Sequence, residues 1–218
     1  MKLEGSTIFR REKINALASR GLNLLRFPKP LESIYQQQYK QEAAKELRYR
    51  FIIVLFINLF LNLGIYQTLP KEMVFSFFIY YVWVSVIILI VWTCAFFPHL
   101  NRWFDIYVGF GSTSVIAITF IMITQLEGGS SNVLFHAGMM YAIMIIYCFL
   151  GLRFYTATIA GWLGGIIGVI VSLLSKTEID WTMLNRTYTF SSVLGMAIAY
   201  AIDRQHRENY LQHCIIEI

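Results

Sequence analysis

His136 is the first residue of this sequence whose type and position suggest chemistry. It follows the Gly-rich stretch Gly128–Ser131 and lies about one helical turn inside a long apolar segment. If that segment crosses a bilayer, an ionisable side chain at this depth is a candidate functional residue. Together with Glu127 and Arg186 in the flanking polar stretches, His136 is a candidate contact for a small ligand or a cation. The alternative is a histidine that is hydrogen-bonded inside a helical bundle.

Other polar residues in or beside the apolar segments are more simply explained by a structural role than by ligand binding. Asn58 and Asn62 are four residues apart, so they share one face of a helix and are candidates for interhelical polar contacts. A ligand contact is the alternative for this pair. Asp105 precedes another apolar segment, where an acidic residue favours a helix start.

No enzyme class is indicated by a motif, so we assign no catalytic residue. The sequence contains no HExxH, GxSxG, P-loop or Gly-rich nucleotide fingerprint. Cys94, Cys148 and Cys214 have no CxxC spacing and are interpreted as packing residues. His206 and His213 are seven residues apart, whereas a metal pair on one helix needs a spacing of four. We therefore expect neither a metal site nor a cofactor.

Composition indicates a membrane protein. Hydrophobic residues make up 57% of the chain and charged residues 14%, and the mean hydropathy is +0.56. Soluble domains are about one quarter charged. The net charge of +5 arises mainly from the first fifty residues, which hold eleven of the eighteen Lys and Arg. This basic stretch leads directly into an apolar segment, which favours an anionic membrane surface over nucleic acid as its partner.

The apolar segments that must position these residues predict an all-α polytopic membrane protein, a bundle of six transmembrane helices. The predicted spans are about 51–69, 73–96, 106–124, 133–152, 155–174 and 187–202. We expect basic, amphipathic N-terminal helices over residues 1–50, with a loosely ordered tail as the alternative for Met1–Phe27. Residues 203–218 are expected to begin a coiled-coil linker. No helix breaker separates the helix expected to start near Pro30 from the first span, so we predict one continuous rod up to Leu69.

Two further patterns concern packing. Gly161, Gly164, Gly165 and Gly168 form small-xxx-small pairs in the fifth span, which permit close helix approach. The last helix leaves the sixth span without a breaker and carries a 3-4 spacing typical of a homodimeric coiled coil. The predicted seam comprises Ala201, Arg204, Glu208, Leu211, Ile215 and Ile218.

Three short motifs resemble those of a known bacterial arrangement. They are Leu25–Glu32 with Tyr35, Tyr39 and Arg48–Arg50; then Leu152–Phe154; and finally Arg207 with Tyr210 and Leu211. The chain resembles the N-terminal six-helix membrane module of bacterial nucleotide cyclases, either class III adenylate cyclases or GGDEF diguanylate cyclases.

The resemblance implies a dimeric sensor and anchor domain in the bacterial inner membrane, regulating a C-terminal cyclase domain. An adenylate cyclase is favoured and a diguanylate cyclase is the alternative. The chain would then be the membrane part of a longer protein, with a small ligand, a cation or a lipid as its stimulus. A small transporter or channel, or a structural anchor without a ligand, remains the rival class.

Charge asymmetry predicts the topology. The N-terminal segment, the second and fourth connections and the exit helix together hold fifteen Lys and Arg, whereas the opposite connections hold three. The positive-inside rule therefore places both termini in the cytoplasm. In a background lacking native cysteines, Ser130→Cys and Thr177→Cys should react with an impermeant maleimide added to intact cells. Ser6→Cys and Gln205→Cys should react only after permeabilisation, and labelling of Ser6→Cys in intact cells would contradict this topology.

Overall fold

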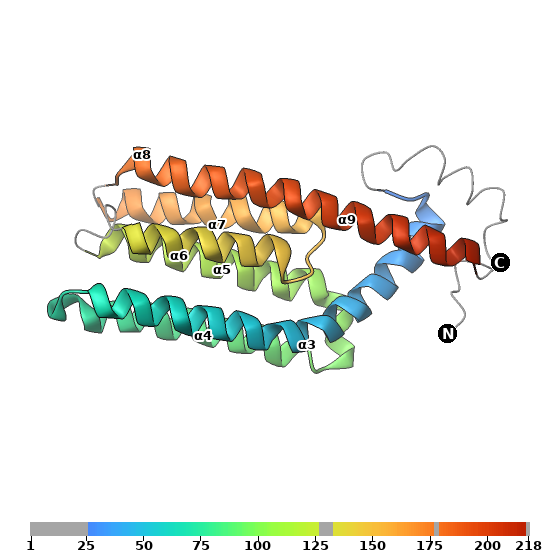
Figure 1. Cartoon of the computed structure of the whole chain (residues 1–218), viewed down its shortest axis with the longest axis horizontal. Coiled ribbons are helices and arrows are strands. Elements are labelled where there is room, and N and C mark those ends of the chain that lie inside the picture. Colours follow the sequence, from blue (N-terminus) through green and yellow to red (C-terminus); the bar gives the residue numbers. More distant parts are fainter. Residues whose placement is uncertain (1–25, 127–132, 177–178, 217–218) are drawn as a thin grey trace.

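The computed structural model describes residues 26–126, 133–176 and 179–216, and over these ranges the fold is all-α, as predicted. The longer helices are α3 (Lys29–Thr68), α4 (Val74–Cys94), α5 (Phe104–Gln125), α6 (Val133–Cys148), α7 (Phe154–Leu174) and α9 (Phe190–Ile216). Short 3-10 helices precede α4 (Lys71–Met73) and α5 (Pro98–Trp103), while α8 (Trp181–Leu184) and a π-helical turn (Asn185–Thr189) precede α9. All these long helices run along one common direction, and the first part of α3 leaves the bundle to meet the end of α9 (Figure 1).

Helix α3 confirms the predicted continuous rod, since it runs without interruption for 40 residues. Pro30 lies in its first turn, where a missing N–H group has no consequence, and Pro70 follows its end at Leu69. The buried side chains of its first part recur every four residues, forming one apolar face. This face comprises Leu31, Tyr35, Tyr39, Ala43 and Leu47.

Helix α5 is the most buried of the long helices and packs against both α4 and α7. Its contact with α7 is close because Gly164 and Gly168 lie at the interface: a Cβ atom on Gly164 would stand 2.8 Å from the Thr113 carbonyl oxygen. Thr113 also donates a hydrogen bond to the Ala160 carbonyl at 3.2 Å. The small-xxx-small pattern of the fifth span therefore has the packing role predicted for it.

The outer surface is apolar and is compatible with a membrane protein. On α4 the side chains of Phe75, Trp83 and Ile90 are all more than half exposed. Among the described residues, four helical segments are long and apolar enough to cross a bilayer: α3, α4 with its preceding 3-10 helix, α5 with its preceding 3-10 helix, and α7. Helix α6 is also apolar, but with 16 residues it is shorter than these.

Two predicted spans have different boundaries in the structure. Helix α6 ends at Cys148 and not at Leu152, because the chain turns at Gly151, whose φ of 68° lies in the left-handed region. The last long helix starts at Phe190 and not at Thr187, because Asn185–Thr189 is wound as a π-helix. It then continues past the predicted span to Ile216.

The α5–α7 contact gives a test of the packing. Gly164→Ala should destabilise the protein by about 1–3 kcal/mol, since a backbone oxygen cannot move aside for the new methyl group. Gly64→Ala on α3 is the matched control, because no atom lies within 4 Å of its added Cβ. The control should be neutral or stabilise by up to about 1 kcal/mol through helix propensity. Thermal unfolding in detergent measures both, and equal effects would contradict the close packing.

Candidate functional site

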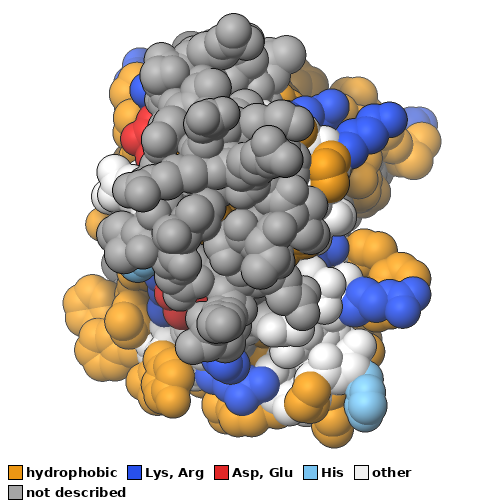
Figure 2. Space-filling model, turned by 90° about the vertical axis from the view of Figure 1, so that its right-hand side faces the viewer, with side chains coloured by type: hydrophobic (Ala, Val, Ile, Leu, Met, Phe, Trp, Pro, Cys, Tyr) orange, Lys and Arg blue, Asp and Glu red, His pale blue; other side chains and the backbone are white. Residues whose placement is uncertain are grey.

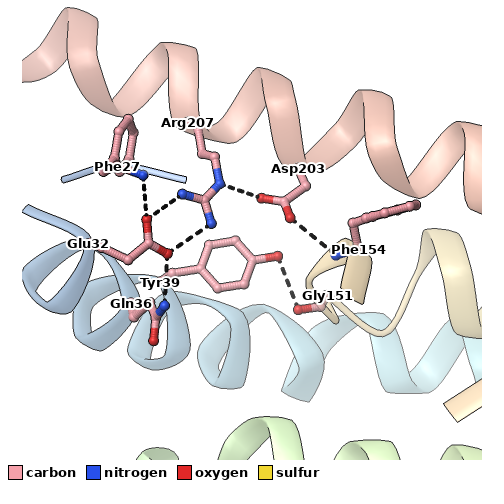
Figure 3. A network of polar contacts seen from close by, with 8 residues as sticks. All are labelled: Phe27, Glu32, Gln36, Tyr39, Gly151, Phe154, Asp203 and Arg207. Atoms are coloured by element: carbon pink, nitrogen blue, oxygen red, sulfur yellow. Dashed lines mark hydrogen bonds and ion pairs between the residues drawn. The ribbon is translucent and has the colours of Figure 1, made fainter. Parts of the chain in front are cut away.

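Two charged residues of α9 are buried, which is the least expected feature of the structure. The exposed fraction is 2% for Asp203 and 3% for Arg207. Buried charges are rare in proteins unless each one is paired and hydrogen-bonded. The partners of these two side chains come from the other end of the sequence and from the start of α7 (Figure 3).

Arg207 joins α9 to the first turn of α3. Its Nη1 donates to Glu32 Oε2 at 2.7 Å and its Nη2 donates to Glu32 Oε1 at 3.1 Å. Its Nε donates to Asp203 Oδ1 at 3.1 Å. The fork-to-fork geometry with Glu32 is the strongest arrangement available to an arginine and a carboxylate. We call Glu32, Asp203 and Arg207 the latch.

The carboxylate oxygens of the latch also accept hydrogen bonds from three other groups. The second oxygen of Asp203 accepts from the Phe154 backbone N–H at 3.1 Å, at the first residue of α7. Glu32 accepts from the Phe27 backbone N–H and from the Gln36 amide, each at 2.8 Å. The latch therefore fixes the starts of α3 and α7 to the same two turns of α9.

An aromatic shell encloses the guanidinium group of Arg207. Its Cζ lies 4.7 Å from the ring centre of Tyr35 and 5.1 Å from that of Phe27. The ring of Tyr210 packs edge-on against Tyr35, with 5.1 Å between centres. These rings shield one side of the guanidinium group from water, which strengthens its ion pairs.

The electrostatics keep Glu32 and Arg207 charged at neutral pH. Burial raises the pKa of Glu32, but hydrogen bonds from Arg207, Gln36 and Phe27 lower it, and the net pKa of this carboxyl lies below its ordinary value. Burial lowers the pKa of Arg207, whereas Glu32 and Asp203 raise it above its ordinary value. Since the Glu32 pKa is depressed on folding, its contribution to stability is complete above the ordinary glutamate range near about 4.3. That contribution is lost as the pH falls through the folded-state pKa.

A second set of polar contacts lies one or two turns further along α3. Asp105, at the start of α5, accepts from Arg153 at 2.7 Å and lies 3.1 Å from Lys40. The Tyr39 hydroxyl donates to the Gly151 carbonyl at 3.1 Å. Asp105 thus does more than favour a helix start, because it joins α5 to the α6–α7 connection and to α3.

The predicted ligand contacts are placed apart from the latch. His136 is 1% exposed, and its Nδ1 lies 3.0 Å from the Thr187 hydroxyl in the π-helical turn. Arg186, the residue before Thr187, is exposed, and Glu127 lies outside the described residues. The structure therefore connects His136 to the start of the last helix through Thr187.

Asn58 and Asn62 are hydrogen-bonded to each other within α3. The Asn62 amide donates to the Asn58 backbone carbonyl at 2.6 Å and to its side-chain oxygen at 3.0 Å. Both residues line a largely apolar groove of about 110 Å³, to which α3, α4, α5 and α6 contribute. Their described contacts are thus local to α3 and not interhelical.

The predicted coiled-coil seam is divided between two faces of α9. Ala201, Arg204 and Glu208 are exposed, with Arg204 Nε donating to Glu208 Oε1 at 2.7 Å, whereas Leu211 is buried. The side chain of Ile215, and Ile218 as a whole, lie outside the described residues. The face that packs inside the chain follows a 4-3-4 spacing through Asp203, Arg207, Tyr210 and Cys214.

Sequence reasoning missed the latch, because Glu32 and Arg207 are 175 residues apart. A signal was nevertheless present. Glu32, Phe154 and Arg207 belong to the three short motifs on which the cyclase resemblance rests, and the fold brings all three together. Asp203 and Arg207 also lie on the same face of the helix as Tyr210 and Cys214, at a regular 4-3-4 spacing that indicates a packed face.

The latch predicts that replacing Arg207 lowers the unfolding midpoint far more than replacing Arg204, although both arginines lie on α9. Arg207→Gln leaves two carboxylates without their cation, and breaking a buried ion pair in this way costs about 3–5 kcal/mol. Arg204→Gln is the matched control, since it removes an exposed Arg–Glu pair from the same helix and should barely move the unfolding midpoint. Thermal unfolding in detergent compares the two. A midpoint for Arg207→Gln as high as that of the control would contradict a buried latch.

Comparison with known proteins does not assign the chain to a family. No protein-family model matches it, and no curated protein matches it significantly. Its function is therefore inferred from the contacts of α3, α7 and α9.

Proposed function

We propose that the chain is a membrane-embedded sensor and anchor domain with six transmembrane helices and both termini in the cytoplasm. It dimerises in the bacterial inner membrane and regulates a nucleotide cyclase joined to the end of α9, an adenylate cyclase in preference to a diguanylate cyclase. One observation supports this proposal above the others. The last helix is fixed by the latch to the segment that precedes the first span.

The latch gives α9 a mechanical connection to the helices in the bilayer. Helix α3 contains both Glu32 and the first span, so that a shift of this span moves the Glu32 carboxylate. Helix α7 begins at Phe154, whose N–H group is held by Asp203. A change in either helix therefore reaches the end of α9, where a following domain would be attached.

The energies involved are suitable for a switch. Typical coupling between two sites is about 1–3 kcal/mol. A single hydrogen bond to a charged group contributes about 1.5–3 kcal/mol. Loss or gain of one Arg207–Glu32 bond is therefore large enough to change the equilibrium between two arrangements of α9, and small enough for a ligand to reverse.

The rival classes are less consistent with the interior of the bundle. Transporters place charged residues and broken helices near the middle of the bilayer. Within the described parts of α3, α4 and α7, the predicted spans contain no residue charged at neutral pH. An anchor without a regulatory role would need no buried ion pair that connects its first and last helices.

A fusion protein tests the proposal. The chain is joined after Ile218 to the catalytic domain of a class III adenylate cyclase, and cyclic AMP formation is measured in membranes. Glu32→Gln weakens the latch, so α9 no longer holds the two catalytic halves of the dimer in one orientation. Activity per inserted protein should fall by about fivefold or more, the lower limit of typical coupling.

Arg204→Gln serves again as the control, because its exposed pair touches neither α3 nor α7. It should leave cyclic AMP formation unchanged. Parent-like activity of Glu32→Gln, at equal insertion and dimer content, would leave an anchor or a transporter as the better interpretation.

A further inference from the structure

A basic cavity of about 460 Å³ lies beside the latch. We use the name basic cavity for the space bordered by the start of α3, the start of α7 and the side of α9. Its basic residues are Arg26, Lys29, Arg153 and Arg207, and its acidic residues are Glu32 and Asp203.

The two acids of this cavity share a single cationic partner, Arg207, and the four basic residues of the lining outnumber them. Glu32 and Asp203 both bind Arg207, and Arg153 binds Asp105 outside the cavity. Arg26 and Lys29 have no acidic partner among the residues that the structure describes; Arg26 instead lies over the ring of Tyr155, 5.4 Å from its centre. The lining of the basic cavity therefore has a net positive charge, and its two cations without an acidic partner can bind an anion.

A donor without a partner is present as well. The Nε of Arg153 is buried and has no hydrogen-bond partner in the described structure. Buried N–H donors are nearly always paired in folded proteins, so an unpaired one next to a basic cavity indicates an acceptor that binds there. The start of α7, which the same residue precedes, adds the positive end of a helix dipole.

The position of the basic cavity indicates the source of the anion. The apolar helix α7 begins at its wall, so the cavity lies where apolar surface gives way to polar surface. Figure 2 shows the end of the molecule where α3 starts and α9 ends. Lys and Arg side chains are visible on this face, with hydrophobic side chains around its rim. In a bilayer, this level is occupied by the phosphate groups of lipids, and basic sites between helices on the cytoplasmic side bind anionic headgroups.

We propose that the basic cavity binds the phosphate headgroup of an anionic phospholipid, with Arg26, Lys29 and the Nε of Arg153 as its contacts. This proposal rests on the proposed function, because it names the class of ligand that acts on the latch. A bound headgroup bridges the start of α3 to the start of α7. It therefore favours the arrangement in which Glu32 reaches Arg207, since separation of the two helix starts would divide the site.

Thermal unfolding of the purified chain in non-ionic detergent tests the lipid site without any cyclase. The probes are short-chain phosphatidylglycerol, phosphatidylcholine with the same chains, and inorganic phosphate. Phosphatidylglycerol should raise the Tm, and the other two should raise it much less. In the double variant Arg26→Gln, Lys29→Gln, the apparent affinity should fall by roughly thirtyfold, since each basic residue near an anionic lipid contributes about fivefold.

The matched control is the double variant Lys71→Gln, Lys176→Gln, which removes two charges from the opposite end of the molecule. Phosphatidylglycerol should raise its Tm as much as that of the parent. An unchanged response of the Arg26, Lys29 variant overturns the site. An equal response to phosphatidylcholine overturns the role of the negative charge, and an equal response to inorganic phosphate overturns a lipid as the ligand. The assay contains no cyclase, so selective lipid binding supports the site whatever the fusion protein shows. If Glu32→Gln leaves the activity of the fusion protein unchanged, that result contradicts the proposed function and not the lipid site.

Discussion

The burial of one guanidinium group constrains the whole end of the molecule at which α3 starts and α9 ends. Arg207 cannot be enclosed by Phe27 and Tyr35 unless carboxylates reach it from two sides, because an unpaired buried charge is severely destabilising. Asp203 is available one turn away on the same helix, but Glu32 must be delivered by α3. The course of α3 past the end of the bundle, and the turn that brings Phe154 under Asp203, both satisfy this requirement (Figure 3).

The bundle itself depends on a different balance, namely close backbone packing with little polar content. Gly164 and Gly168 allow α7 to approach α5, and the Thr124–Ser172 contact at 2.7 Å adds one of the few side-chain bonds between them. Helices α3 and α4 instead present large apolar side chains outward. Since lipid provides no hydrophobic drive for helix association, such small-residue contacts supply the specificity. The ion pairs of the described residues, in contrast, lie at the end of the molecule where the basic residues gather.

Local sequence patterns predicted the parts of the fold that local physics determines. The spacing from Leu31 to Leu47 and the prolines at either end predicted α3 as one helix, and the glycines of the fifth span predicted close packing. The boundary at Phe190 was missed because a π-helical turn leaves no clear mark on hydrophobic periodicity. The Glu32–Arg207 pair was missed because nothing local specifies a partner 175 residues away, and because charged residues after a span are ordinarily solvated.

The uninterrupted course of α3 makes this helix a lever. No Pro or Gly occurs between Leu31 and Leu63, so the backbone hydrogen bonds continue from the first span to the latch. The arm from Leu47 to Glu32 is about 22 Å long at 1.5 Å per residue. If the span tilts by about 5° in response to a thicker or thinner bilayer, Glu32 moves by roughly 2 Å. A displacement of that size separates a carboxylate from a guanidinium held at 2.7 Å, so that in the proposed membrane domain a change in bilayer thickness would alter the position of the last helix.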